Sequence, residues 1–495
     1  MKIPHIITLL LLFVSSQVLA QNAAIHANNI TKNEVESHVR FLASDELEGR
    51  KAGYRGNDLA ARYIAEQFRR NGVSTVPGHD SYYQPFSLEE ITPAETVDFT
   101  LMESQVAYMK DMIMLNGGKF NYDGEVVFVK YGVSKADYEG ADVEGKIVAV
   151  QVGSPTEQSP QAVFNLIKQK QVLAEEMGAI GMVELYNLRV PWTAMAGYLG
   201  GGRMQLASNK KAALPTFWVN DTGNTYLKKL TNAESANIKV ETEGGKITER
   251  TTQNIVGFIE GTDPKLKDEY VMMTAHFDHV GVGKEGAPNV TEEDMVFNGA
   301  RDNAIGTTAI LSASRILAAN PPKRSILLIA FTAEELGLIG SRYYADNPWL
   351  PLNKCIFNLN IDNGGYNDTS IVTVIGLERT GAKEQMEMAT KAFGLSVIDD
   401  PAPEQGLFDR SDNVNFAVKG IPSPTFSLGF TSFDKEILKY YHQITDEAES
   451  VDFDYVLKYC QSYTYAAELI ANLRKQPKWE KGDKYEEAYK KLYKD

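Results

Sequence analysis

Residues 271–278 read Val-Met-Met-Thr-Ala-His-Phe-Asp, and residues 325–335 read Ser-Ile-Leu-Leu-Ile-Ala-Phe-Thr-Ala-Glu-Glu. Each stretch begins as an apolar run of strand length and ends in side chains that can hold a metal ion or a proton. Strand-like runs that alternate with helical patterns predict an α/β fold with a mostly parallel sheet between two layers of helices. Further runs lie at 355–361 and 371–375, and helical patterns separate the first three runs at 307–319 and 334–345.

The composition of the chain excludes several classes of protein. A chain of 495 residues is too long for one ordinary domain, and a hydrophobic fraction of 43% excludes global disorder. The formal net charge of −15 disfavours nucleic acid as a partner, because no basic excess is available to neutralise phosphates. With only two cysteines, a disulfide scaffold and a cysteine-rich zinc finger are both excluded. A metal site in this chain would therefore use histidines and carboxylates.

The first 20 residues have the pattern of a secretory signal peptide. Lys2 precedes an apolar run at 6–14, and Val18-Leu-Ala20 ends the segment with a small residue. The run is too short to span a bilayer, so we expect an exported, periplasmic or secreted protein without stable membrane insertion. Export permits a Cys355–Cys460 disulfide, and two separate buried thiols are the alternative.

The rest of the chain divides into three stretches with different sequence patterns. Residues 28–88 contain two helical patterns, one opened by a capping box at Thr31 and Glu34 and one ended by Asn71-Gly72. The stretch 97–245 is rich in short β-type runs, and the third stretch carries the alternating pattern described above. The Lys/Glu-rich tail from Lys475 is expected to form a solvated terminal helix.

Potential metal ligands cluster at the ends of the predicted elements of the third stretch. Open α/β sheets place their sites outside the carboxyl ends of the strands, so these side chains are expected to converge. Taken alone, each has an ordinary structural interpretation, such as a helix cap for Asp302 or an acidic first turn for Glu334-Glu335. The candidates are His276, Asp302, Glu335, Asp362 and His442, with Glu334, Asp278 and His279 beside them.

These residues occur in strings that resemble the co-catalytic zinc aminopeptidases of the bacterial leucyl aminopeptidase type, whose relatives include glutamate carboxypeptidase and glutaminyl cyclase. The strings are Thr274-Ala-His-Phe-Asp-His, Gly299-Ala-Arg-Asp-Asn-Ala-Ile-Gly, Phe331-Thr-Ala-Glu-Glu-Leu-Gly-Leu-Ile-Gly-Ser, Asn358-Leu-Asn-Ile-Asp and Tyr441-His, with Phe41-Leu-Ala-Ser-Asp-Glu-Leu-Glu-Gly-Arg in the first stretch. The middle stretch resembles a protease-associated domain, in Gly145-Lys-Ile-Val, Glu176-Met-Gly-Ala-Ile-Gly-Met-Val and Leu214-Pro-Thr-Phe.

The resemblance implies a three-layer α/β/α zinc-peptidase domain split by a β-rich, protease-associated-like insertion. The implied parts are a signal peptide at 1–20, a catalytic domain at 21–96 and 247–495, and an insertion at 97–246.

The resemblance also implies two zinc ions bridged by Asp302, although Co²⁺ or Mn²⁺ could substitute in such a site. His276 and Asp362 would complete one site, and Glu335 and His442 the other. Glu334 would act as general base on a water shared by the metals, and Asp278 would accept the second ring proton of His276. His279 is the one histidine of the third stretch that receives no role.

Two positions depart from the family pattern. Arg301 stands where relatives often carry an acid, and it is expected to change the charge at the mouth of the site. Asn413 replaces the histidine of a Ser-Asp-His loop, so the segment 406–413 faces the substrate or is a structural turn.

The implied function is an exported metalloaminopeptidase that hydrolyses N-terminal residues from peptides. A carboxypeptidase or dipeptidase with the same di-zinc site is the alternative, followed by a glutaminyl cyclase and a catalytically inactive receptor-like protein.

Overall fold

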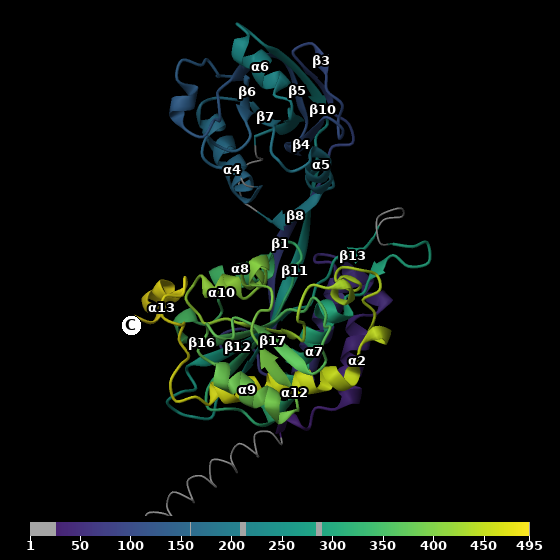
Figure 1. Cartoon of the computed structure of the whole chain (residues 1–495), viewed down its shortest axis with the longest axis vertical. Helices are drawn as coiled ribbons and strands as arrows, with labels where there is room; N and C mark the ends of the chain where they lie inside the picture. Colours follow the sequence, from purple (N-terminus) through teal and green to yellow (C-terminus); the bar gives the residue numbers. More distant parts are fainter. Residues whose placement is uncertain (1–25, 159, 208–213, 284–289, 495) are drawn as a thin grey trace, which may run out of the picture. The chain divides into compact units, whose positions relative to one another are not determined.

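A computed structural model describes residues 26–158, 160–207, 214–283 and 290–494 (Figure 1). The expected signal peptide at residues 1–20 lies outside this range. The chain forms two compact units, one from the residues before Ser87 and after Arg250 and one from Ser87–Arg250. They are called the first and second unit below, and each is described by itself.

The first unit is built on one sheet, as the alternating pattern predicted. Its strand order is β18-β17-β19-β16-β12-β15-β11-β1. The pairs β16–β12, β12–β15, β16–β19 and β17–β18 are parallel, so the α/β class with a mostly parallel sheet is confirmed. The strands are β1 (Tyr83–Thr92), β11 (Lys246–Ile259), β12 (Tyr270–His276), β15 (Ser325–Phe331), β16 (Cys355–Ile361), β17 (Ile371–Ile375), β18 (Ser396–Ile398) and β19 (Thr425–Leu428), and a separate hairpin joins β13 (Gly281–Val282) and β14 (Val296–Phe297).

Helices cover both faces of this sheet (Figure 1). Successive side chains of a strand point to opposite faces, so a strand buried on both sides contributes alternate residues to two cores. In β15 the residues Ile326, Leu328 and Ala330 belong to one core and Leu327, Ile329 and Phe331 to the other. The first core is completed by α2 (Lys32–Leu42), α3 (Arg55–Arg70), α7 (Ile305–Ala319), α9 (Lys383–Ala392) and α12 (Phe453–Ala471), and the second by α8 (Ile339–Asp346) and α10 (Val414–Ala417).

The N-terminal helices follow their sequence signals. The side chain of Thr31 accepts a hydrogen bond from the backbone N–H of Glu34, which places the start of α2 where the capping pattern predicts it. Helix α3 ends at Arg70, followed by Asn71-Gly72. Both helices bury one apolar face in the first core. Cys355 and Cys460 are buried free thiols, so the alternative of two separate thiols holds.

The C-terminal tail differs from its prediction. It does end in a helix, α13 (Glu486–Tyr493), but three of its four aromatic residues are buried rather than solvated. Trp479, Tyr485 and Tyr489 pack in one cluster with Phe408, and the Trp479 indole donates a hydrogen bond to the carbonyl of Gly420. The tail therefore packs against the protein despite its Lys/Glu-rich composition, because burying large aromatic rings is favourable.

The second unit has its own sheet and its own hydrophobic cores. An insertion was expected at residues 97–246, whereas the compact unit spans Ser87–Arg250. Its strands are β2 (Asp98–Leu101), β3 (Ser104–Gln105), β4 (Met112–Asn116), β5 (Phe120–Phe128), β6 (Ile147–Gln151), β7 (Gly181–Tyr186), β9 (Thr216–Asn220) and β10 (Asn237–Thr242) in the order β3-β2-β10-β5-β6-β7-β9-β4, with β8 (Arg203–Leu206) paired to the end of β1 and with helices α4 (Pro160–Glu176), α5 (Trp192–Gly200) and α6 (Thr225–Asn232).

Within the described ranges, no helix has both the length and the apolar character needed to cross a membrane.

Candidate active site

The candidate site lies at the carboxyl end of three neighbouring parallel strands. Strand β12 ends at His276, β16 is followed by Asp362, and β15 leads into a turn that carries Glu334 and Glu335. These strands are adjacent in the order β16-β12-β15, so their ends meet at one edge of the sheet. This is the position where open α/β sheets place ligands.

One cluster of potential ligands surrounds His276. Its Nε2 lies 3.3 Å from Oδ1 of Asp302 and 3.4 Å from Oδ1 of Asp362. The imidazole is buried, and its Nε2 has no hydrogen-bond partner within the described part of the chain. These three residues form a group that could hold a metal ion.

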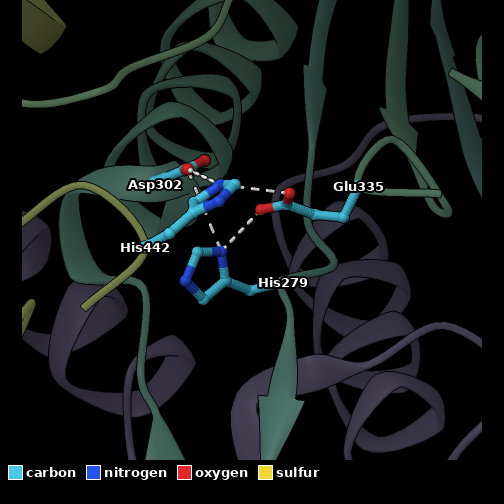
Figure 2. Close-up of side chains that lie close together, drawn as sticks. All are labelled: His279, Asp302, Glu335 and His442. Carbon is cyan, nitrogen blue, oxygen red and sulfur yellow. Dashed lines mark hydrogen bonds and ion pairs between the residues drawn. The ribbon is translucent and has the colours of Figure 1, made fainter. Parts of the chain in front are cut away.

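A second cluster surrounds His442 (Figure 2). Its Nε2 lies 3.1 Å from Oδ2 of Asp302 and 3.2 Å from Oε2 of Glu335. Asp302 thus directs one carboxylate oxygen to each cluster, and His279 joins the second cluster through Glu335. The imidazole of His442 is 37% exposed and the carboxylate of Asp362 is 23% exposed, so the clusters open to solvent at these two side chains.

These spacings fit zinc. Two ligand atoms bound to one tetrahedral zinc ion at about 2.0–2.1 Å lie about 3.3 Å from each other. All four nitrogen–oxygen distances from His276 and His442 fall between 3.1 and 3.4 Å. Imidazole nitrogen and carboxylate oxygen are also ordinary zinc ligands. The residues present therefore suit a zinc ion in each cluster, with Asp302 shared between them.

The electrostatics of the clusters favour positive charge. Burial opposes protonation of His442, yet the adjacent carboxylates of Asp302 and Glu335 raise its pKa to about 10. Burial would raise the pKa of Glu335, and so would Asp302, but contacts with His279 and His442 lower it to about 2. A site whose carboxylates hold charge this firmly is suited to bind a divalent cation.

The two glutamates lie in a turn, not in a helix as the sequence pattern predicted. Helix α8 begins only at Ile339, because Ala333 and Leu338 adopt left-handed φ values of 59° and 60° that interrupt the helix. Asp278 holds this turn, since its Oδ1 accepts from the N–H of Glu334 at 3.1 Å and its Oδ2 accepts from the N–H of Glu335 at 3.4 Å. Burial, together with repulsion from Asp362 and Glu335, raises the pKa of Glu334 well above its ordinary value.

The expected contact between Asp278 and His276 takes a different form. The carboxylate of Asp278 lies 3.7 Å from Nδ1 of His276, which is too long for a hydrogen bond. The main-chain carbonyl of Asp278 lies closer, at 3.2 Å. Asp278 therefore contacts Nδ1 chiefly through its main chain, while its carboxylate binds the turn of Glu334.

Arg301 does not lie at the mouth of the site, so that expectation is wrong. Its side chain is 3% exposed and pairs with Asp446 at 3.0 Å, with the guanidinium 3.7 Å from the ring centre of Tyr440. A cation this far from solvent needs a counter-ion, and Asp446, four residues after His442, supplies it. The pair links the backbone beside Asp302 to the segment that carries His442.

The segment 406–413 contains a structural contact at the position that departs from the family pattern. The buried side chain of Asn413 donates to the carbonyls of Phe408 and Ser423, at 3.1 and 3.0 Å. Asn413 thereby fixes the turn, which favours the structural interpretation for this residue.

Two buried residues near the site received no role from the sequence. His279 contacts Glu335, and Arg50 donates to the carbonyls of Phe277, Asn298 and Gly299. For His279, the only sequence feature that pointed to the site was its position directly after the His-x-Asp string. Arg50 lies in the family-like string of the first stretch, but nothing in its spacing indicated contacts more than 200 residues away.

Parts of the chain resemble known peptidases. Residues 254–464 match the model of peptidase family M28. The chain is 28% identical to aminopeptidase YwaD of Bacillus subtilis over 68% of this chain and 73% of that protein, and 26% identical to the probable leucine aminopeptidase 2 of Aspergillus oryzae over 75% and 67%. A solved structure of an aminopeptidase from Aneurinibacillus sp. strain AM-1 shares the fold, with a TM-score of 0.58, 21% identity and coverage of 89% of this chain and 94% of that one.

The chain is a zinc metallopeptidase, and its residues 254–464 resemble peptidase family M28.

Proposed function

We propose that this chain is an exported di-zinc aminopeptidase that removes N-terminal residues from peptides. The observation that carries the proposal is the pair of ligand clusters sharing Asp302, one with His276 and Asp362 and one with Glu335 and His442. The names of the relatives in Bacillus subtilis and Aspergillus oryzae support the choice of aminopeptidase. The signal-peptide pattern of residues 1–20 supports export.

Each side chain would have a separate task. His276, Asp362, Asp302, Glu335 and His442 would hold the two ions. When bound, the zinc ions supply Lewis acidity, which lowers the pKa of water and polarises a carbonyl group.

Glu334 would act on the proton of the attacking water. It adjoins Glu335 in sequence but belongs to neither ligand cluster, so its carboxylate is free to take that proton and pass it to the leaving amine. Its raised pKa suits a base that must also release the proton. The carboxylate of Asp278 keeps Glu334 in place by accepting its backbone N–H.

A single substitution tests the role of Glu334. Glu334→Gln keeps the size of the side chain but removes the base, so we expect kcat to fall by a factor of about 10²–10⁴ while zinc content stays near two per chain. Metal analysis on the same preparation is the control. A variant with normal turnover would exclude Glu334 as the base, and a wild-type protein with one zinc ion would contradict the di-zinc site.

Substrate polarity is tested with blocked dipeptides. An aminopeptidase should cleave a dipeptide amide with a free amino group and leave the N-acetylated dipeptide intact. The opposite preference would establish a carboxypeptidase, and cleavage of the doubly free dipeptide alone would establish a dipeptidase.

We also propose that the second unit is the protease-associated-like insertion. Its support is the run of parallel strands β5-β6-β7-β9 with hydrophobic cores of its own. A fragment of Ser87–Arg250 should then unfold cooperatively by itself, and a fragment without a cooperative transition would contradict an independent module.

A further inference from the structure

His279 is buried beside the ligand clusters, and nothing in the proposed mechanism uses it. Its ring has no exposed surface, and its Nδ1 lies 2.7 Å from Oε1 of Glu335. The other oxygen of Glu335, Oε2, faces His442 at 3.2 Å. The carboxylate of Glu335 is thus divided between two histidines, as Figure 2 shows.

The two distances indicate two different kinds of contact. A separation of 3.2 Å matches two ligands of one tetrahedral zinc ion, which lie about 3.3 Å apart. A separation of 2.7 Å is too short for two ligand atoms of one tetrahedral zinc ion and matches a charge-assisted hydrogen bond. His279 is therefore placed to bind Glu335 and not to bind the metal itself.

The tautomer follows from the surroundings of the ring. Nδ1 faces a carboxylate, whereas the buried Nε2 has no hydrogen-bond partner within the described ranges. A buried N–H without an acceptor is costly, so the proton belongs on Nδ1, where it is donated to Glu335.

The backbone around His279 fixes the orientation of its ring. Gly299 has a φ of 57°, and a Cβ at this position would lie 2.6 Å from Cγ and Cδ2 of His279. The imidazole thus occupies space that only a glycine leaves open. Asp302 lies three residues after Gly299, so the ring packs against the segment that provides the shared ligand.

We propose that His279 is a positioning residue that sets the affinity of the Glu335–His442 zinc site, by holding Oε1 of Glu335 so that Oε2 remains directed at the metal. This proposal rests on the di-zinc site proposed above. Hydrogen bonds to a metal ligand orient it, and their loss typically weakens metal binding by about 10–100-fold. The effect should fall chiefly on one site. Among the interactions of the described residues, His279 lies 2.7 Å from Glu335 and 4.0 Å from Oδ2 of the shared Asp302, and none joins it to His276 or Asp362.

Two substitutions separate positioning from direct ligation. His279→Leu removes the donor, whereas His279→Asn keeps an N–H donor near the position of Nδ1. His38→Leu is the matched control, since His38 is also a buried histidine whose Nδ1 makes one 2.8 Å hydrogen bond, to Tyr63. The measurement is titration of the chelator-treated full chain with Zn²⁺ in competition with a chromogenic chelator, and the visible spectrum of the Co²⁺-loaded protein reports the geometry of each site.

We expect wild type and His38→Leu to bind two zinc ions with the same affinities. His279→Leu should bind one ion normally and the other about 10–100-fold more weakly, with an altered Co²⁺ spectrum, and His279→Asn should restore most of the loss. In a His442→Ala background, where the second site is already disrupted, His279→Leu should have no further effect on the remaining ion.

Other outcomes overturn the proposal in distinguishable ways. Equal losses in the Leu and Asn variants would identify His279 as a ligand, because an amide is a poor substitute for imidazole on zinc. Two unchanged affinities in His279→Leu would show that His279 does not position Glu335. If His279→Leu does not fold, a His279→Gln variant replaces it, because its amide donor is displaced toward Nε2. Two unchanged zinc affinities and an unchanged Co²⁺ spectrum in that variant would also overturn the positioning role of His279. A wild-type protein that binds fewer than two ions would instead refute the proposed function.

Discussion

Removing the carboxylate of Asp446 should destabilise the first unit strongly. Asp446 forms an ion pair with Arg301 at 3.0 Å, and the two side chains are only 1% and 3% exposed. Its Oδ2 also accepts the backbone N–H groups of Arg301 and Asp302, at 2.9 and 3.2 Å. Asp446→Ala leaves a buried cation without a counter-ion, and breaking a buried pair in this way costs about 3–5 kcal/mol. The same loss releases the backbone of the shared ligand, so zinc affinity should fall as well.

The chain offers a matched control on its surface. Lys419 and Asp346 form an ion pair at 2.8 Å, but their side chains are 39% and 57% exposed. Solvent screens this pair, so Asp346→Ala should cost about 0–1 kcal/mol.

The free energy of unfolding of both variants can be measured by denaturant unfolding that is monitored through hydrogen exchange of peptides from the first unit, so that the second unit does not contribute. Arg301→Met added to Asp446→Ala should recover part of the lost stability, because the unpaired cation is removed. If Asp446→Ala costs no more than Asp346→Ala, or if the second substitution recovers nothing, then the buried Arg301–Asp446 pair does not stabilise the first unit.

Three further predictions concern metal, pH and the C-terminal tail. Zinc at about 100 times its dissociation constant should stabilise the protein by about 2.7 kcal/mol per site relative to chelator-treated protein, and equal unfolding midpoints would contradict binding to the folded state. Burial lowers the pKa of His38 from 6.5 to about 4, so His38 takes up a proton at a higher pH in the unfolded chain than in the folded one. The free energy of unfolding should therefore fall by up to about 3 kcal/mol as the pH drops from 6.5 to 4. His38→Gln should flatten this slope in denaturant unfolding measured at several pH values. Trp479→Ala should cost about 3–5 kcal/mol in thermal unfolding, because the indole is buried and bonded to Gly420, whereas a solvated tail would tolerate the change.

Most of the sheet could be read from the sequence because its strands are buried on both faces. A strand such as β15 needs apolar residues at every position, so the run at 325–331 marks it without knowledge of its neighbours. The start of α2 was predictable for a similar reason, since the cap of Thr31 depends only on residues a turn away. By contrast, the start of α8 was predicted five residues too early, at Glu334 instead of Ile339, because left-handed residues in the turn leave no periodic signal.

Some features of the candidate site could likewise be predicted from local sequence, and others could not. The sequence by itself determined the metal-ligand types, the strands that carry them and the family resemblance, because these depend on residue identity and local spacing. Only the tertiary structure decided that Arg301 lies buried against Asp446 and that His279 contacts Glu335. These partners are 145 and 56 residues apart in the chain, and no local pattern couples residues so distant. Their pairing follows from the folding of separate segments over one edge of the sheet, where buried polar groups must find partners.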